Sequence, residues 1–260
     1  MTEAESVLFE TAGSVAWVTI NRPERRNAIN PEVVRGIDAA IARADADDSI
    51  AAVILTGAGD KAFCAGGDLA GMTAQGKVQQ HLERAEVGTL FETMRASRLP
   101  IIARVNGHAL AGGFGLMLAC DLVVASDAAE VGTPEIDIGL WPFMITALIQ
   151  RDVPRKIALE MMLTGRRMTA ADAHRWGFVN RVVPSEELDA AVSTLTDELV
   201  SKSPLIMKLG KKSFYEAEDM SVAHALDYLS GMLTVCLESE DTVEGVTAFL
   251  QKRRPAWKGR

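Results

Sequence analysis

The sequence has few cysteines, no excess of positive charge and no long apolar run. Its three cysteines are an odd number without metal-ligand or CxxC spacing, so neither a disulfide framework nor a metal site is expected. A net charge of −8 makes a nucleic-acid partner a poor candidate. No run of about 18 apolar residues occurs, and the first ten residues lack a basic and an apolar segment. We therefore expect a cytoplasmic protein with no membrane partner.

Several signatures of familiar chemistry are also missing. A GxSxG elbow is absent, which argues against that type of serine hydrolase, and neither a Walker loop nor a GxGxxG fingerprint is present. What remains is a globular composition, 48% hydrophobic and 24% charged, in a chain long enough for one large core or a main domain with an appendage. Such an acidic chain favours a small-molecule substrate.

Short β-branched runs alternate with helical patterns up to about Pro154. One expected helix starts after Asn30, a possible N-cap, with Pro31 at its first position. Strands that alternate with helices favour an α/β architecture. The expected strands are Val15–Ile20, Ala52–Thr56, Ile101–Val105 and Leu122–Ala125, with an apolar helix over Phe114–Ala119 before the last.

Beyond Pro154 the pattern is almost entirely helical. The helix expected over Ser221–Leu237 carries an apolar stripe that needs a partner, either the first part of the chain or another subunit. Periodicity alone does not choose between them. The other helices are expected over Arg155–Leu163, Ala170–Arg175, Glu186–Leu199 with Ser185 as its cap, Pro204–Ala217 and Thr242–Lys252.

Two glycine-rich segments each follow an expected strand. The first, KAFCAGGDL, places Gly67 before Asp68, and the second, NGHALAGGFGLMLACD, places Gly112 at the start of an apolar helix. Backbone N–H groups at such glycines are not shielded by side chains, and two of them together stabilise an oxygen that becomes negative during a reaction. We therefore infer an oxyanion hole. Paired glycines are also common in plain turns, which is the alternative.

A third segment, EVGTPEIDIGLW, carries Glu135 among apolar residues. Loss of hydration there would raise the pKa of the carboxyl group and make it a usable acid or base. A surface glutamate or a helix-cap partner is the alternative. Two further residues are weaker candidates: a lone histidine such as His108 is more often structural than catalytic, and Cys64 has no paired base nearby in the sequence and is interpreted as packing.

Together these segments resemble the crotonase family, the enoyl-CoA hydratase/isomerase superfamily. KAFCAGGDL, VNGHALAGGFGLMLACD and PEIDIGLWP occur in the family's order, and the likeness extends from NRPERRNAI to the tail FLQKRRPAW. The resemblance implies a spiral of ββα repeats over residues 1–200 with an acyl-CoA site. It also implies a helical region over residues 201–260 that covers this site and forms homotrimers or hexamers.

The resemblance also implies residue roles. The two oxyanion-hole amides fall on Gly67 and Gly112, and Glu135 is the acid/base. Coenzyme A enters as part of the substrate, an acyl-CoA thioester of fatty acid metabolism, and no tightly bound cofactor is expected. The residues that match substrate- and CoA-binding positions are Arg25, Arg26, Ala28, Ala65, Gly67, Asp68, Leu69, Trp141, Phe249 and Lys252.

Two departures from the family pattern matter for the chemistry. Hydratases of this family carry a second glutamate at the position of Gly115, and Phe143, Met144 and Ile145 follow Pro142 where many hydratases have a glycine-rich turn. A single carboxyl suits double-bond isomerisation through an enolate. Hydration of 2-enoyl-CoA remains open if another polar group orients the water, and a non-catalytic acyl-CoA-binding protein is the alternative from a different class.

Overall fold

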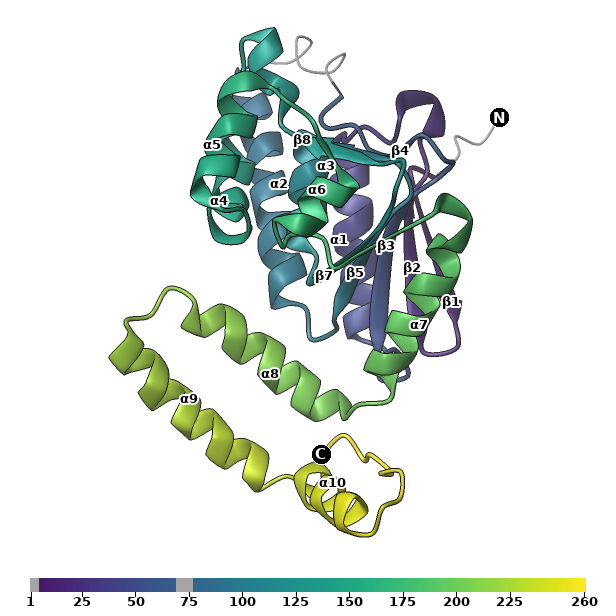
Figure 1. Ribbon diagram of the computed structural model, residues 1–260, viewed down its shortest axis with the longest axis vertical. Helices are drawn as coiled ribbons and strands as arrows, with labels where there is room; N and C mark the ends of the chain where they lie inside the picture. Colours follow the sequence, from purple (N-terminus) through teal and green to yellow (C-terminus); the bar gives the residue numbers. More distant parts are fainter. Residues whose placement is uncertain (1–4, 69–76) are drawn as a thin grey trace.

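The computed structural model describes residues 5–68 and 77–260, which form two β-sheets flanked by helices (Figure 1). The larger sheet is parallel except for its edge strand β1, and the smaller is parallel except for β9. In sheet order, the larger contains β1 (Val7–Ala12), β2 (Val15–Ile20), β3 (Ala52–Gly57), β5 (Ile101–Val105), β7 (Leu122–Ser126) and β10 (Arg181–Val183). The smaller contains β4 (Ala62–Cys64), β6 (His108–Leu110), β8 (Glu130–Gly132) and β9 (Met168–Thr169).

From β3 to β8, each pair of successive strands contributes one strand to each of the two sheets. β3, β5 and β7 join the larger sheet, and β4, β6 and β8, which directly follow them, join the smaller one. A helix follows each pair, so the chain winds as a spiral of ββα turns. The helices of this part are α1 (Pro31–Asp45), α2 (Lys77–Ala96), α3 (Gly112–Ala119), α4 (Phe143–Asp152), α5 (Arg155–Thr164) and α6 (Ala170–Arg175).

The corners between the two sheets require close backbone approach. Gly107 lies between β5 and β6, and a Cβ atom there would lie 2.4 Å from the carbonyl carbon of Lys61. Only glycine fits such a contact.

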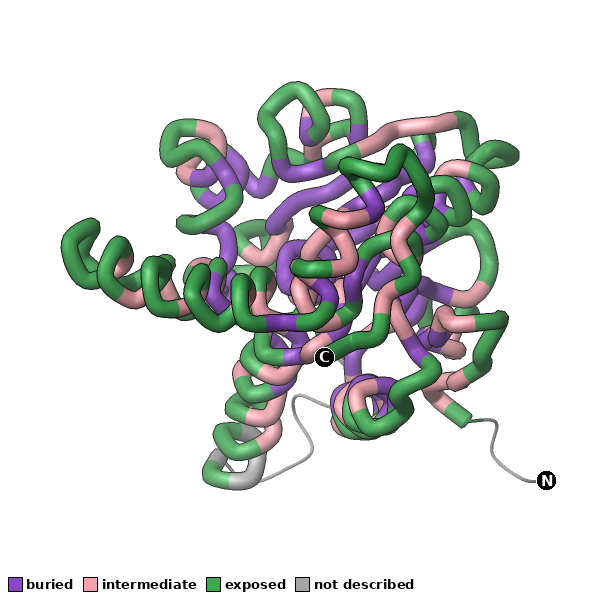
Figure 2. The backbone as a smooth tube through the Cα atoms, turned by 90° about the horizontal axis from the view of Figure 1, so that it is seen from below, coloured by how far each residue is buried: buried purple, intermediate pink, exposed green. Residues whose placement is uncertain are grey.

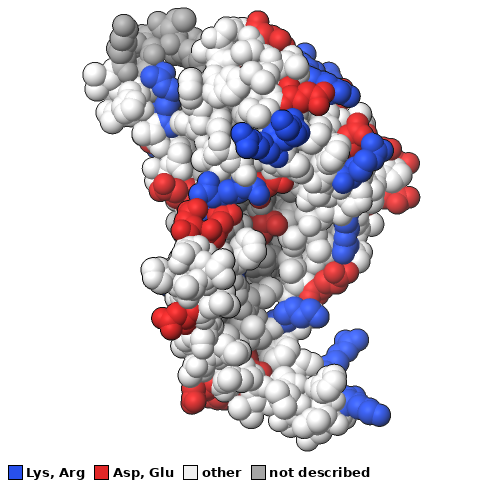
Figure 3. All heavy atoms as spheres, turned by 60° about the vertical axis from the view of Figure 1, so that its left-hand side comes forward, with Lys and Arg blue, Asp and Glu red and all other residues white. Residues whose placement is uncertain are grey.

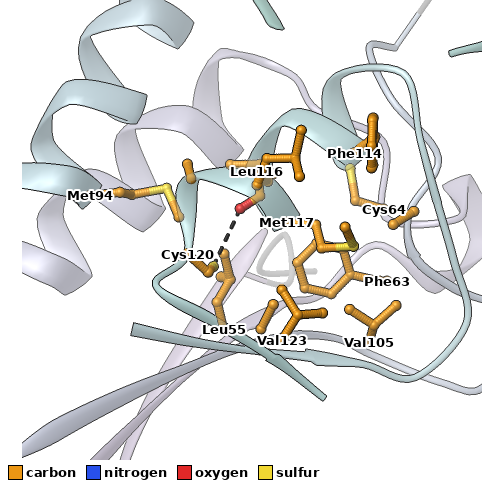
Figure 4. Close-up of a cluster of buried hydrophobic side chains, with 14 of the residues drawn as sticks. Leu55, Phe63, Cys64, Met94, Val105, Phe114, Leu116, Met117, Cys120 and Val123 are labelled. Carbon is orange, nitrogen blue, oxygen red and sulfur yellow. Dashed lines mark hydrogen bonds between the residues drawn. The ribbon is translucent and has the colours of Figure 1, made fainter. Parts of the chain in front are cut away.

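The core lies between the sheets and α1, α2 and α3. Figure 4 shows Phe63 from β4 and Leu55 from β3 facing α3, where Met117 is also fully buried. Cys120 ends α3, and its thiol donates to the Leu116 carbonyl at 3.3 Å. Nearly every side chain of α3 is buried, which fixes the position of this helix and of its N-terminus.

Most expected elements of regular structure are confirmed. α1 begins as expected, because the Asn30 side chain accepts from the Val33 amide at 2.9 Å and Pro31 occupies the first position. The prediction that Ser185 caps α7 (Leu188–Val200) was wrong. A 3-10 turn, η4 (Ser185–Glu187), precedes that helix, and the Ser185 hydroxyl instead hydrogen-bonds Ser126 at 2.6 Å.

The C-terminal helices project away from the sheets (Figure 1). They are α8 (Pro204–Ala217), α9 (Val222–Leu237) and α10 (Glu240–Leu250). No residue of α9 is buried, and Figure 2 shows this part of the tube as mostly exposed. No helix of the described residues is both long and apolar enough to cross a membrane.

Polar contacts attach α8 to the core. The Lys211 ammonium group contacts the Asp121 carboxylate at 2.7 Å, and the Tyr215 hydroxyl donates to the same carboxylate at 2.7 Å. Asp121 also accepts from the Ile101 amide at the start of β5. Because the side chains of Lys211 and Asp121 are only 10% and 15% exposed, loss of the lysine leaves a largely shielded carboxylate without its cation.

We therefore expect Lys211→Met to lower the free energy of unfolding by about 3 kcal/mol, measured by urea denaturation at matched protein concentration. Lys212→Met is the matched control. It removes an exposed pair with Glu216 on the same helix and should cost at most about 0.5 kcal/mol. Equal effects of the two substitutions would contradict a buried role for Lys211.

Candidate functional site

The two glycine segments lie against each other. Gly67 follows β4, and Gly112 is the first residue of α3. A Cβ atom on Gly66 would lie 3.5 Å from the Gly112 nitrogen, and one on Gly112 would lie 3.9 Å from the Gly67 nitrogen. The two amides predicted from the sequence are therefore neighbours in space.

Neither amide donates a hydrogen bond to an acceptor in the described part of the chain. The bridge between Ile29 and Gly67 is made by the Gly66 carbonyl and the Asp68 amide, at 2.8 Å each, so the Gly67 amide faces the other way. Gly112 is the first residue of its helix and has no intrahelical acceptor. Its amide lies at the positive end of the α3 dipole, which favours a negatively charged ligand atom.

Ala111 adopts a strained conformation just before this amide. Its φ of 51° and ψ of −128° are values that glycine adopts far more readily than alanine. The Ala111 amide donates to the Gly132 carbonyl at 2.8 Å, which holds the turn in place. The strain is therefore located at the turn that orients the Gly112 amide.

Glu135 is placed near the same turn by the smaller sheet. Leu110 pairs with Gly132, and Glu135 follows in the 3-10 helix η3 (Pro134–Ile138). Its Oε2 atom is buried and has no hydrogen-bond partner among the residues that the structure describes. Burial raises the pKa of this carboxyl above its ordinary value, although its own backbone amide opposes the shift.

The sequence predicted that the neighbouring apolar residues would raise the pKa of Glu135, and this explanation was partly wrong. Of the apolar residues around Glu135 in the sequence, only Val131 is buried, whereas Ile136, Ile138 and Leu140 are exposed. In a 3-10 turn neighbouring side chains point in different directions, so residues adjacent in sequence do not have to surround the carboxyl group. The fold, and not the local sequence, buries the Oε2 atom of the half-buried Glu135.

The position of a second carboxyl group is closed. A Cβ atom on Gly115 would lie 2.3 Å from Cγ2 of Ile145 and 2.9 Å from Cζ of Phe91. A longer side chain therefore cannot enter there unless the side chains of Ile145 and Phe91 shift. Ile145 belongs to the segment after Pro142 that departs from the family pattern, so both departures meet at one place.

The residues expected to bind coenzyme A do not form one group within the single chain. Arg25 and Arg26 are exposed in and after the 3-10 turn η1 (Pro23–Arg25), where guanidinium groups can meet phosphates. Ala28 and Ala65 are half-buried beside the Gly67 segment, and Asp68 is paired with Arg22. Leu69 lies outside the described residues. Trp141 is half-buried and packs on the core next to η3.

Phe249 and Lys252 lie far from these residues within one chain. Phe249 is 82% exposed on α10, at the opposite end of the molecule from β4 (Figure 1). The structure of a single chain therefore does not bring the tail to the glycine segments.

The weaker candidates have structural roles. Nδ1 of His108 accepts the Glu130 amide at 3.1 Å, which ties β6 to β8. Cys64 is fully buried, and burial raises the pKa of its thiol to about 12, which makes it unreactive. Within residues 5–68 and 77–260, no cluster of three or more His, Cys, Asp or Glu side chains is suited to a metal ion.

Sequence reasoning missed three residues that shape the site. The Ile29 side chain reaches within 3.1 Å of the Cβ position of Gly112. Phe91 closes the space at Gly115, and Arg22 contacts the residue after Gly67. Ile29 and Arg22 lie in the NRPERRNAI motif that carried part of the resemblance, whereas no local signal distinguishes Phe91 from other helix residues.

Known proteins resemble this chain over nearly its whole length. The short-chain-enoyl-CoA hydratase of Clostridium acetobutylicum is 34% identical over 97% of both chains. The carnitinyl-CoA dehydratase of Proteus mirabilis is 35% identical over 99% of this chain and all of its own length. The crystal structure of an enoyl-CoA hydratase from Mycobacterium smegmatis superimposes with a TM-score of 0.94 at 33% identity, covering 97% of this chain and 98% of that one.

These likenesses confirm the α/β crotonase-like fold. Residues 10–260 match the family described as enoyl-CoA hydratase/isomerase. The order of the motifs, the two ββα-linked sheets and the paired glycine segments all agree with this match. The chain therefore belongs to the enoyl-CoA hydratase/isomerase family.

Proposed function

We propose that this chain is an enzyme that moves the double bond of an enoyl-CoA thioester. Gly67 and Gly112 hold the thioester oxygen, and Glu135 carries the proton. The observation that supports this proposal most directly is that Oε2 of Glu135 is buried without a hydrogen-bond partner among the described residues, at a site where Ile145 and Phe91 occupy the space of a second carboxyl group.

The mechanism needs one group that both accepts and donates a proton. The Glu135 carboxylate removes a proton from C2 of a 3-enoyl thioester, and the electron pair moves onto the thioester oxygen as a dienolate. The two amides stabilise this charge without reorganising. The protonated Glu135 then delivers the proton to C4, which leaves the double bond between C2 and C3. A raised pKa suits both steps.

Hydration is the second candidate function, favoured by the relatives. The two relatives described above are named as a hydratase and a dehydratase. Addition of water to a 2-enoyl thioester requires a group that orients the water in addition to Glu135. A protein that binds acyl-CoA without turnover is the third candidate, and the glycine at position 115 is its support.

The binding of coenzyme A is part of the same proposal. Arg25 and Arg26 present guanidinium groups to its phosphates, and Ala28, Ala65 and Asp68 line the path toward Gly67. Trp141 lies beside the acyl part, and Phe249 and Lys252 reach the cofactor part from a neighbouring subunit. The substrate thus supplies the coenzyme, and no separate cofactor is needed.

We further propose that the chain forms homotrimers or hexamers through its C-terminal helices. The apolar stripe of α9 is exposed in the single chain, at Val222, Leu226, Leu229, Leu233 and Leu237. Figure 3 shows a surface with few charges over much of the lower part of the molecule, where these helices lie. An exposed apolar face of this kind favours association.

Glu135→Gln tests the catalytic proposal with a panel of 3-enoyl and 2-enoyl thioesters. For the wild type we expect turnover of the 3-enoyl set, and for the variant a fall in kcat of about 10²- to 10⁴-fold, since no proton can be carried. Asp137→Asn, an exposed carboxylate in the same turn, is the matched control and should retain activity. Turnover of the 2-enoyl set alone would support hydratase, and binding without turnover would support the third candidate.

The same variant should be more stable than the wild type at about pH 7. Burial raises the folded-state pKa of Glu135, so the folded chain loses stability as pH rises through the ordinary carboxyl range, and the loss is complete above the folded pKa. Glutamine has no charge to desolvate. We expect a higher midpoint of thermal unfolding at about pH 7, and equal midpoints below about pH 4. A lower midpoint at about pH 7 would contradict the burial of an unpaired carboxylate.

Sedimentation velocity at micromolar concentration tests the oligomer. We expect a trimer or hexamer for the wild type, and dissociation when Leu233 on α9 is replaced by Glu, because a charge in an apolar interface is poorly hydrated. Leu163→Glu, at an exposed leucine of α5, is the control and should leave the assembly intact. A wild-type monomer would refute the proposal.

A further inference from the structure

One guanidinium group links the two segments next to the proposed oxyanion hole. Nη2 of Arg22 contacts Oδ2 of Asp68 at 2.9 Å, and Nη1 of the same residue donates to the Ala28 carbonyl at 2.6 Å. The side chains are only 16% and 20% exposed, respectively. Asp68 directly follows Gly67, so Arg22 acts one residue away from the amide.

Backbone hydrogen bonds continue this link along both segments. The Ile29 amide donates to the Gly66 carbonyl, the Asp68 amide donates to the Ile29 carbonyl, and the Ala65 amide donates to the Arg26 carbonyl, all between 2.8 and 3.0 Å. Residues 26–29 therefore run beside residues 65–68 as a short parallel pair. This pairing turns the Gly67 amide away from residues 26–29.

A buried asparagine anchors the other side of the same segment. Asn27 is fully buried with φ of 56°, and its side-chain amide donates to the carbonyls of Ala58 and Ala62, at 3.0 and 2.7 Å. Its side-chain oxygen accepts the Arg22 amide at 3.0 Å. Arg22 is thus held at its backbone by Asn27 while its guanidinium holds Asp68.

Gly67 itself has no side chain that packing can hold. An oxyanion hole works only if its donors stay within about 0.5 Å of their positions, because their benefit comes from not having to reorganise. A half-buried ion pair contributes defined geometry more reliably than net stability. We propose that Arg22 is a positioning residue that fixes the Gly67 amide for the charged state of the substrate. This inference rests on the proposed function of that amide.

The two possible roles of Arg22, positioning the Gly67 amide or only stabilising the fold, predict different changes in ligand affinity. If Arg22 only stabilises the fold, its loss affects all ligands alike. If it positions the amide, its loss affects ligands with a negative oxygen more than neutral ones. The two probes are acetoacetyl-CoA, whose bound enolate has its own ultraviolet absorption, and butyryl-CoA, which stays neutral.

The experiment compares Arg22→Met with the wild type at a fixed pH. We expect the affinity for the enolate form of acetoacetyl-CoA to fall at least tenfold, while the affinity for butyryl-CoA changes less than threefold. Arg25→Met is the matched control, an exposed arginine of the same segment expected to contact phosphates, and it should weaken both ligands equally. Equal effects of Arg22→Met on both probes, or no effect, would overturn the inference.

A conservative variant keeps the test decisive if Arg22→Met does not fold. Lysine retains the charge near Asp68 but, as a compact ammonium without the guanidinium fork, cannot make both contacts at once. Arg22→Lys is expected to fold and to bind butyryl-CoA normally, and its affinity for the enolate is expected to fall at least threefold. An unchanged affinity for the enolate would refute the positioning role of Arg22. A wild type that binds neither probe would instead refute the proposed function.

Discussion

Close backbone contact between the end of β4 and the start of α3 is the constraint on which the site depends. A Cβ atom on Gly113 would lie 2.1 Å from the Cys64 carbonyl oxygen, so these two segments meet without any side chain between them. This contact is what makes the Gly67 and Gly112 amides neighbours. The burial of α3 and the close approach at Gly107 fix the positions of the segments that form this contact.

The two departures from the family pattern are one change in packing. Gly115 has no side chain, and Ile145 from α4 together with Phe91 from α2 occupies the space beside it. An apolar contact thus lies where the resemblance to the hydratases of this family implies a carboxyl group. The chemistry and the packing are coupled here, because a charged group at this place would need both room and a polar partner.

The two parts of the chain are stabilised by different forces. Apolar side chains hold the spiral together, whereas α8 meets it through Asp121, Lys211 and Tyr215. These polar contacts have defined geometry and orient a helix whose apolar side chains are at most half-buried. The apolar faces of the C-terminal helices therefore stay available to another surface.

Local sequence determined the parts of this protein whose cause is local. The cap at Asn30, the β-branched runs of β2, β3 and β5 and the helices after Pro204 were predicted because their signals lie within a few residues. The motifs also singled out Gly67, Gly112 and Glu135. Short strands such as β4 and β6 were missed, since three residues carry too little periodicity. Only the tertiary structure decided that the two amides meet, that one carboxyl oxygen of Glu135 is buried, and that Ile145 closes the space at Gly115. These contacts join residues far apart along the chain, and their distances follow from how the sheets and helices pack.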